Sequence, residues 1–321
     1  MSAEDAVLSD YETSQILLLC SISESKGAPV PISEITLLVP RLTKERLLKA
    51  WNAKNELSSK YSIVNDFIVP HTGKKEITFA EDYKQSISNL SVARQFLRLC
   101  GHSWLECLCV SGSTSYFSAR KEDDIDLFCI TKSGYTWIFL TKALILARLF
   151  RWINKNASEL TISLVMDRIY ALIDFSTPKD PLYARDALTT VEIFGSSFYR
   201  NLLMRSKWME DIYPLLYKRK VSEHSPTAEP RTRISDQRSA GKAVTLLNVF
   251  LYFVIGRYIL LRAWLANRRL SKLRKRGAIF RVRIGPRYLV YESAQYLALK
   301  RVYYQLGRLI KLDRGISLAE G

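Results

Sequence analysis

The sequence contains few of the residues that build disulfide frameworks, zinc sites or histidine-based active sites. Its 321 residues include five cysteines and three histidines. No two cysteines have the C-x-x-C spacing, and the histidines occur singly along the chain. This composition argues against a disulfide framework and against structural zinc, and it predicts buried, reduced thiols.

Targeting segments and long uncharged apolar runs are also scarce. The first residues, MSAEDAVLSD, lack the basic-then-apolar pattern of a signal peptide, so we expect a cytoplasmic protein. The run AVTLLNVFLYFVIG has 14 uncharged residues, fewer than the ~20 that cross a bilayer. We expect residues 243–266 to form a helix that is buried or faces a partner. Peripheral membrane contact is a less favoured alternative, suggested by the basic segment NRRLSKLRKR that follows.

Acidic residues are rare in the last third of the chain. Residues 1–214 contain 25 Lys/Arg and 25 Asp/Glu, whereas residues 215–321 contain 23 and 6, so the formal charge of +17 lies entirely in this part. Such a segment attracts nucleic acid phosphates or an anionic membrane surface. We expect it to bind RNA, with Phe280 and Tyr288 available for base stacking. The basic residues concerned are Arg268, Arg269, Lys272, Arg274, Lys275, Arg276, Arg281, Arg283 and Arg287.

The first 81 residues have the pattern of a winged helix-turn-helix. Ser9 and Glu12 have capping-box spacing before an apolar run, and two more short helical patterns precede a hairpin pattern around Asn65 and Asp66. The third helix would face a DNA groove with its cations, Lys44, Arg46, Lys49 and Lys54. Balanced charge over this segment favours the alternative, a helical module for protein contact.

Residues 82–218 alternate strand and helix patterns, which predicts an α+β domain with a mixed sheet covered by helices. Strands are expected in WLECLCVSG, DIDLFCIT and LTISLVMDRIYALIDF, with a long apolar helix in TWIFLTKALILARLFRWI. Residues 219–242 are polar and contain two prolines, which is typical of a flexible linker. Residues 243–321 are expected to form a basic, helix-rich region.

The stretch VSGSTSYFSARKEDDIDLFCIT, residues 110–131, has the chemistry of a phosphate and metal site. Asp124 and Asp126 are two residues apart, so both carboxylates leave one face of a strand, where hard oxygen ligands suit Mg²⁺. Gly112 lets the backbone approach a phosphate, whose oxygens can accept from nearby N–H groups and from the Ser113 hydroxyl. Together these residues suit phosphoryl or nucleotidyl transfer.

This motif resembles the signature of the DNA polymerase beta-type nucleotidyltransferase superfamily. The segment EDDIDLFCIT followed by an apolar helix is particularly similar to prokaryotic nucleotidyltransferase-domain proteins of unassigned substrate. The resemblance implies a palm-like mixed sheet. It also implies that Gly112 and Ser113 hold the nucleotide phosphates, and that Asp124 and Asp126 ligate two Mg²⁺ ions.

The resemblance also implies a third carboxylate from a later strand. Asp167 is the best candidate because it interrupts an apolar strand pattern, with Asp174 as the rival, and Arg168 offers a structural ion pair as an alternative explanation of Asp167. Arg120 and Lys121 are further candidates for triphosphate contact.

Three functions therefore compete. The first is a magnesium-dependent nucleotidyltransferase that moves a nucleoside monophosphate from an NTP, with ATP as the expected donor, to a hydroxyl acceptor such as RNA. The second is a nucleic-acid-binding regulator whose N-terminal module reads DNA and whose degenerate transferase domain senses nucleotide. The third is a membrane-surface protein that uses the apolar helix and the basic cluster.

Overall fold

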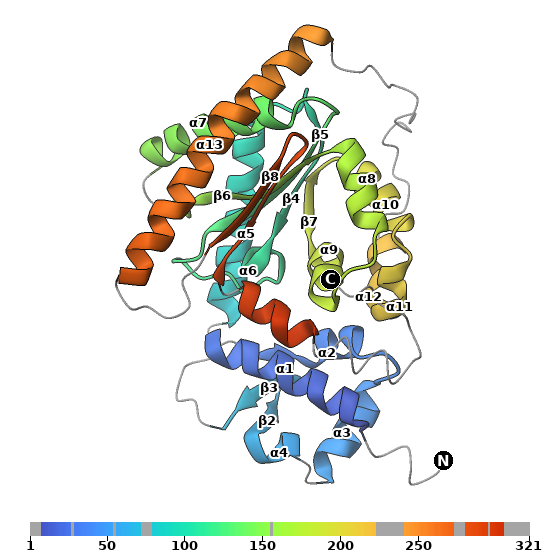
Figure 1. Cartoon of the computed structure of the whole chain (residues 1–321). Helices are drawn as coiled ribbons and strands as arrows, with labels where there is room; N and C mark the ends of the chain where they lie inside the picture. Colours follow the sequence, from blue (N-terminus) through green and yellow to red (C-terminus); the bar gives the residue numbers. More distant parts are fainter. Residues whose placement is uncertain are drawn as a thin grey trace.

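The computed structural model of the chain describes residues 8–26, 29–53, 56–71, 79–154, 157–222, 241–272, 280–294 and 296–304. Within them the protein is a mixed α+β structure with one sheet of six strands and one of three. Figure 1 shows the large sheet between two groups of helices, with the N-terminal module packed at one end.

The described part of the N-terminal module combines four helices with the small sheet. The capping box is confirmed, because Ser9 N donates to Glu12 Oε2 (2.8 Å) and Glu12 N to Ser9 Oγ (3.2 Å). The strands pair antiparallel in the order β1-β3-β2. The elements are α1 (Asp10–Lys26), β1 (Val30–Pro31), α2 (Ile32–Leu38), α3 (Lys44–Asn52), α4 (Glu56–Lys60), β2 (Tyr61–Val64) and β3 (Phe67–Pro70).

The large sheet has the order β7-β4-β5-β6-β9-β8. The pair β5–β6 is parallel, and every other pair is antiparallel. Its strands are β4 (Leu105–Ser111), β5 (Ile125–Thr131), β6 (Leu160–Asp167), β7 (Val191–Phe194), β8 (Arg281–Gly285) and β9 (Tyr288–Glu292).

The central strands are apolar on both sides because helices cover both faces of the sheet. Cys109 and Phe128 face a core built with the α8–α12 side, whereas Leu108 and Leu127 face a core shared with α5, α7 and α13. All five cysteines are buried and free, as predicted. The helices are α5 (Phe79–Cys100), α6 (Gly112–Ser115), α7 (Thr136–Ile153), α8 (Arg168–Ser176), α9 (Pro181–Thr189), α10 (Ser196–Met204), α11 (Trp208–Ile212), α12 (Pro214–Ser222) and α13 (Lys242–Lys272).

Several sequence-based expectations need correction. The strand expected over 160–175 ends at Asp167, whose side chain caps the start of α8 by accepting from Tyr170 N. The short strand β7 was not expected. The C-terminal region is not a separate helical part, because β8 and β9 form a hairpin that extends the large sheet through β6. Of the expected linker, residues 219–222 belong to α12, and residues 223–240 lie outside the described residues.

The helix α13 also differs from expectation. It was expected to be buried or to face a partner. The stretch Lys242–Arg269 is long and apolar enough to cross a membrane, yet only 11% of its apolar 18-residue window is buried. Within the described residues burial is therefore wrong for this helix, and contact with a partner stays a prediction.

Gly195 offers a stability test of the sheet, because it begins α10 with a positive φ of 73°. A Cβ at this position would overlap the backbone carbonyl oxygen of Glu106, in the neighbouring strand β4. We expect Gly195→Ala to lower the free energy of unfolding by at least ~3 kcal/mol, since backbone cannot move aside as a side chain can.

The control is Gly101→Ala, which has a similar φ of 64° and nothing within 4 Å of its Cβ position. It isolates the backbone strain, about 1 kcal/mol. Urea unfolding of both variants measures the difference, and equal losses would contradict the steric explanation.

Candidate functional site

The Gly-Ser turn lies directly against the Asp126 carboxylate. Ser111 ends β4 and pairs with Asp126 on β5, so the next residue, Gly112, passes beside this side chain. Gly112 has a φ of 68°, and a Cβ here would lie 2.6 Å from Asp126 Oδ2. The positive φ therefore favours glycine at this position, and any side chain here would displace the Asp126 carboxylate.

Helix α5 and the following loop hold this turn in place. Asn89 Nδ2 donates to Thr114 Oγ1 (3.1 Å), and Ala119 N donates to Ser86 Oγ (3.0 Å). Ser118 N closes the turn by donating to Ser113 O (3.0 Å). Because Asn89, Ser86 and Thr114 are buried, these contacts are shielded from water and fix the shape of the turn.

The two aspartates occupy the start of β5, as the sequence predicts. Asp124 is exposed just before the strand, and Asp126 is half-buried within it, between the buried residues Ile125 and Leu127. Tyr291 on β9 lies within their electrostatic reach. Burial, followed by the negative charges of Asp124 and Asp126, raises the pKa of the Tyr291 phenol to about 12. Sequence reasoning missed Tyr291, because only sheet pairing brings β9 to this site.

The loop with Arg120 and Lys121 returns the chain from the turn to β5. Arg120 N donates to Asp123 Oδ2 (3.2 Å), and Asp123 N donates to Arg120 O (3.1 Å). The side chain of Lys121 is exposed and that of Arg120 is half-buried. Both residues are near the site in the chain, and their contact with a triphosphate stays a prediction.

Asp167 is wrong as the third carboxylate beside this pair. In the parallel pairing of β5 with β6, Asp126 lies opposite Thr161, whereas Asp167 lies opposite Thr131 at the other end of β5. Five residues along a strand separate the two positions by about 16 Å. Asp167 instead caps α8 and lies 3.7 Å from Arg287 Nε, and its burial raises the pKa of its carboxyl group.

The other carboxylates near β6 are also engaged elsewhere. The rival, Asp174, accepts from Tyr183 Oη (2.7 Å) and pairs with Lys179. Glu159 precedes the residue that pairs with Ile125, which makes it the nearest carboxylate in the β6 chain, but it forms an ion pair with Arg151. Among the described residues no group of three His, Cys, Asp or Glu side chains is placed to hold a metal ion.

One residue of the basic cluster, Arg281, lies at the same end of the large sheet as the aspartate pair. Asn267, near the end of α13, exchanges two hydrogen bonds with the backbone of Phe280, and Arg281 then begins β8. In the β8–β9 ladder, Arg281 lies opposite Glu292. Because β9 is antiparallel to β6 and β6 is parallel to β5, this register places Arg281 at the same end of the sheet as Asp126. Three strand spacings make the separation across the sheet about 14 Å.

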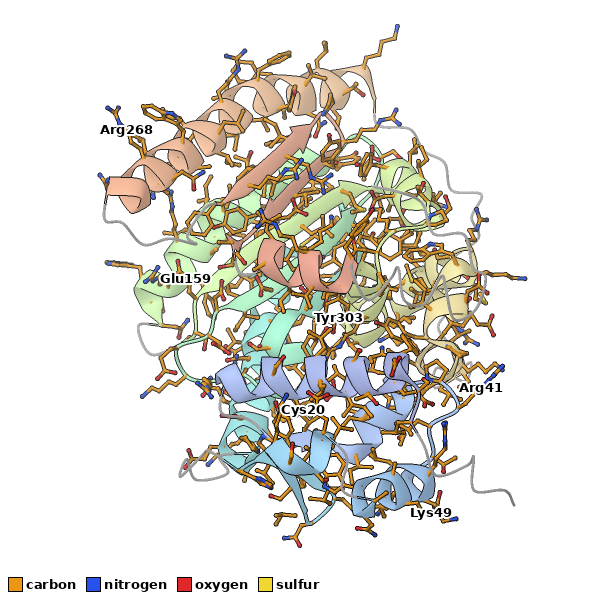
Figure 2. The ribbon with its side chains drawn as sticks, turned by 60° about the horizontal axis from the view of Figure 1, so that its bottom comes forward. Cys20, Arg41, Lys49, Glu159, Arg268 and Tyr303 are labelled. Atoms are coloured by element: carbon orange, nitrogen blue, oxygen red, sulfur yellow. The ribbon has the colours of Figure 1, made fainter. Side chains whose placement is uncertain are left out.

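The other predicted RNA-binding residues have different surroundings. Arg268 and Arg269 are exposed at the end of α13, and Figure 2 shows Arg268 at the periphery of the molecule. Arg283 lies 3.7 Å from Glu292, and Arg287 lies at the far end of the sheet with Asp167. Those whose side chains lie outside the described residues are Lys272, Arg274, Lys275 and Arg276.

The two aromatic residues expected to stack on bases already stack within the protein. Tyr288 packs on Tyr170 with ring centroids 4.3 Å apart, and Phe280 packs on Tyr291 at 5.3 Å. The basic cluster therefore offers charge for a polyanion more readily than stacking platforms.

The third helix of the N-terminal module presents fewer free cations than expected. Arg46 pairs with Glu12 (2.6 Å), Lys44 pairs with Asp66 (2.6 Å), and Lys54 lies outside the described residues. Lys49 is exposed, and Figure 2 shows it at the opposite extremity of the molecule from Arg268. Among the described residues, the exposed Lys49 of this module and the exposed Arg268 of α13 are therefore too far apart to share one nucleic acid surface.

No family model matches the chain, and no curated protein or solved structure shows a significant match to it.

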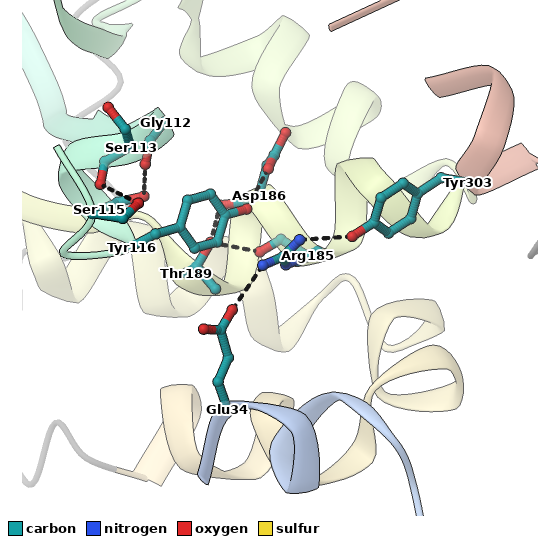
Figure 3. A network of polar contacts seen from close by, with 10 residues as sticks. Glu34, Gly112, Ser113, Ser115, Tyr116, Arg185, Asp186, Thr189 and Tyr303 are labelled. Carbon is teal, nitrogen blue, oxygen red and sulfur yellow. Dashed lines mark hydrogen bonds and ion pairs between the residues drawn. The ribbon is translucent and has the colours of Figure 1, made fainter. Parts of the chain in front are cut away.

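A buried polar network supports the Gly-Ser turn from beneath, and sequence reasoning missed it (Figure 3). Tyr116, at the end of α6, donates to Asp186 Oδ1 (2.6 Å), and its ring lies 4.6 Å below the Arg185 guanidinium. Arg185 in turn donates to Tyr303 Oη and pairs with Glu34, both at 2.7 Å. The network thus joins the turn to α9, to the helical residues 296–304 that carry Tyr303, and to the N-terminal module.

Arg185 makes this junction energetically significant. Its guanidinium is nearly buried, so removing one partner would leave an uncompensated charge in a medium of low polarity. The residues of this polar network come from separate helices. The sequence of each helix shows only an apolar periodicity with polar interruptions, so it does not reveal that tertiary packing brings these residues together.

Asp186 gives the network a pH dependence. Burial raises the pKa of its carboxyl group to about 6, against the lowering effects of the Tyr116 hydrogen bond and the Arg185 charge. The pKa of Asp186 in the folded protein thus exceeds the unfolded value of about 3.9. The protonated carboxyl group therefore stabilises the fold at low pH, and this stabilisation is lost as pH rises through 6. Relative to Asp186→Asn, the wild type should lose roughly 1 kcal/mol of unfolding free energy between pH 5 and pH 7.

Urea unfolding of the two proteins at both pH values measures this difference. Asparagine can still accept the Tyr116 hydrogen bond, so the variant isolates the ionisation. Stabilities that change in parallel with pH would contradict the raised pKa.

Proposed function

We propose that the protein is a magnesium-dependent nucleotidyltransferase of the DNA polymerase beta type. It would move a nucleoside monophosphate from an NTP, with ATP as the expected donor, to a hydroxyl acceptor. The observation that carries the proposal is the contact between the Gly112 turn and Asp126. A turn suited to phosphate and a carboxylate suited to metal lie side by side, with a second carboxylate two residues away.

The residues present suit a magnesium ion bound together with a nucleotide. Magnesium usually takes one or two protein carboxylates, and water and substrate phosphates complete its shell. Asp126 lies at the turn that would hold those phosphates, and Asp124 is exposed to solvent. Magnesium would supply neutralisation of the phosphate charge and activation of the acceptor hydroxyl. Two carboxylates support one such ion well, and a second ion would need ligands that the described residues do not bring together.

The protein's own groups would act mainly by positioning. Gly112 and Ser113 would hold the terminal phosphates, and the contacts from α5 would keep the turn from shifting during the reaction. The acceptor oxygen would bond to the α-phosphorus as the bond to the departing pyrophosphate breaks. The hydroxyl proton would pass to a basic group or to water near Asp124 and Asp126.

A polyanionic acceptor such as RNA is supported by the position of the basic residues. Arg281 begins β8 at the sheet end that carries Asp124 and Asp126, and the exposed Arg268 and Arg269 precede it at the end of α13. The positive charge would bind an RNA backbone beside the carboxylates and attract its phosphates over several ångströms.

A second candidate, a regulator with a degenerate nucleotide-sensing domain, is favoured by one observation. Thr161 occupies the position opposite Asp126 on β6, where a third carboxylate would complete the metal site. Its companion role, DNA binding by the N-terminal module, is weakened by the ion pairs that engage Lys44 and Arg46.

Replacing the aspartate pair tests the proposed reaction. The purified protein is incubated with each α-labelled NTP, Mg²⁺ and a cell extract, and label is followed into RNA, protein and small molecules. We expect Asp124→Ala/Asp126→Ala to lower incorporation at least about 100-fold, because the charge that holds the metal is lost.

Asp167→Asn is the matched control, since it removes a carboxylate at the far end of the sheet and retains an acceptor for the α8 cap. Equal incorporation by the double variant and the wild type would refute the site. NTP binding without incorporation into any fraction would favour the nucleotide-sensing regulator.

Gly112→Ala tests the contact between turn and carboxylate. The new methyl group would force the Asp126 carboxylate to rotate, so we expect incorporation to fall at least about tenfold. Gly101→Ala is again the control, because it has the same type of backbone strain and nothing within 4 Å of its Cβ position. If both variants lose equal activity at equal stability, the contact has no catalytic importance.

A further inference from the structure

Helix α13 is attached to the large domain along one stripe of its surface. Asn248 Oδ1 accepts from Trp137 N (2.8 Å), and Tyr252 packs on the Trp137 ring at 5.3 Å. Gly256 lies against Ile284 and Trp137, and Asn267 is bonded to Phe280. These contacts recur at helical spacing from 248 to 267, a length of about 28 Å. The helix is therefore fixed lengthwise against the domain.

The opposite side of α13 is apolar and exposed. It continues onto the end of the neighbouring helix α7, to which Arg148 joins it by donating to Tyr258 Oη (3.0 Å). Figure 1 shows α7 and α13 together on one side of the sheet. We call this surface the outer apolar layer; its exposed large residues are Ile145, Leu149, Trp152, Ile153, Leu246, Leu247, Val249, Phe250, Phe253, Val254, Tyr258, Leu260, Leu261, Trp264 and Leu265.

All the charge on these two helices is positive. Neither Thr136–Ile153 nor Lys242–Lys272 contains an aspartate or glutamate. Arg257 is exposed among the apolar residues of α13, and Arg262, Arg268 and Arg269 lie toward its end. Monomeric soluble proteins rarely expose so many contiguous large apolar side chains, so a partner is expected to cover them.

The charge distinguishes between the possible partners. Pairing the layer with the same layer of a second copy would bring these arginines together without a carboxylate from either helix to offset them. Crossing a bilayer would require α13 to abandon its contacts with Trp137, Ile284 and Phe280. A membrane surface with anionic lipids supplies both an apolar phase and negative charge, and it leaves the helix attached to the domain.

We propose that the outer apolar layer docks in the plane of an anionic lipid membrane. The side chains of Phe250, Phe253 and Trp264 enter the boundary between headgroups and acyl chains, where aromatic residues are favoured. Arg257 extends its guanidinium to lipid phosphates while its methylene groups stay among apolar neighbours. The contacts that support membrane docking do not depend on whether the protein catalyses nucleotidyl transfer.

Flotation of the full-length protein with lipid vesicles, without nucleotide, tests the proposal. We expect at least about tenfold more protein to float with vesicles of mixed phosphatidylcholine and phosphatidylglycerol than with phosphatidylcholine alone. Added salt should reduce the difference, because the arginine contribution is electrostatic.

A triple variant identifies the layer as the surface responsible. Phe250→Gln/Phe253→Gln/Trp264→Gln alters side chains that are 62%, 55% and 54% exposed, so the fold should be preserved. Binding to the anionic vesicles should fall at least about tenfold. The matched control, Leu99→Gln/Ile173→Gln/Leu215→Gln, alters exposed apolar residues on α5, α8 and α12 and should bind as the wild type does. Equal thermal unfolding midpoints confirm that the variants are folded.

Several results would overturn the proposal. One is the absence of flotation with anionic vesicles, and another is equal flotation of the wild type and the triple variant. A stable dimer in size-exclusion chromatography that the triple variant dissociates, with no vesicle binding, would assign the layer to self-association. Binding of an RNA oligonucleotide that the triple variant loses, again without vesicle binding, would assign it to RNA.

Discussion

The antiparallel pairing of β4 with β5 controls the geometry on which the candidate site depends. Because Ser111 pairs with Asp126, the chain must leave β4 directly beside that carboxylate, and the lack of a side chain at Gly112 makes this approach possible. The ten residues between Ser113 and Asp124 form a turn and a loop that bring the chain back to the same edge. Backbone pairing thus places the turn that is proposed to hold phosphate beside the carboxylate that is proposed to bind metal.

The parallel pairing of β5 with β6 excludes Asp167 from the site that contains Asp124 and Asp126. The sequence correctly places Asp167 in an apolar strand pattern, but Asp167 is the last residue of β6, and its distance from Asp126 depends on strand direction. A strand, a helix and a second strand in succession favour parallel pairing, which puts the end of the second strand far from the start of the first. Because α7 connects β5 to β6, this rule predicts that Asp167 lies far from Asp126. It also predicts that Glu159 and Thr161, around the start of β6, are the residues near Asp126.

Local patterns in the sequence were reliable where neighbouring residues determine the structure. The capping box of Ser9 and Glu12 and the bounds of α7 are as expected, because caps and apolar periodicity act within a few residues. The β8–β9 hairpin was missed although RVRIGPRYLVYE alternates around a Gly-Pro turn, because the basic charge of the region suggested helices. Its pairing with β6, and hence the placing of Tyr291, depends on residues more than 100 positions away.

The path of α13 connects the outer apolar layer to the carboxylate site. From its attachment at Trp137 the helix runs to Asn267, which is bonded to Phe280, and β8 then starts at the sheet end that carries Asp124 and Asp126. The cationic end of the helix is therefore the part of the layer nearest the site. Because lipid headgroups and RNA phosphates both bind guanidinium groups, a membrane and a polyanionic acceptor would compete for Arg268 and Arg269, whereas the apolar side chains of α13 would favour the membrane alone.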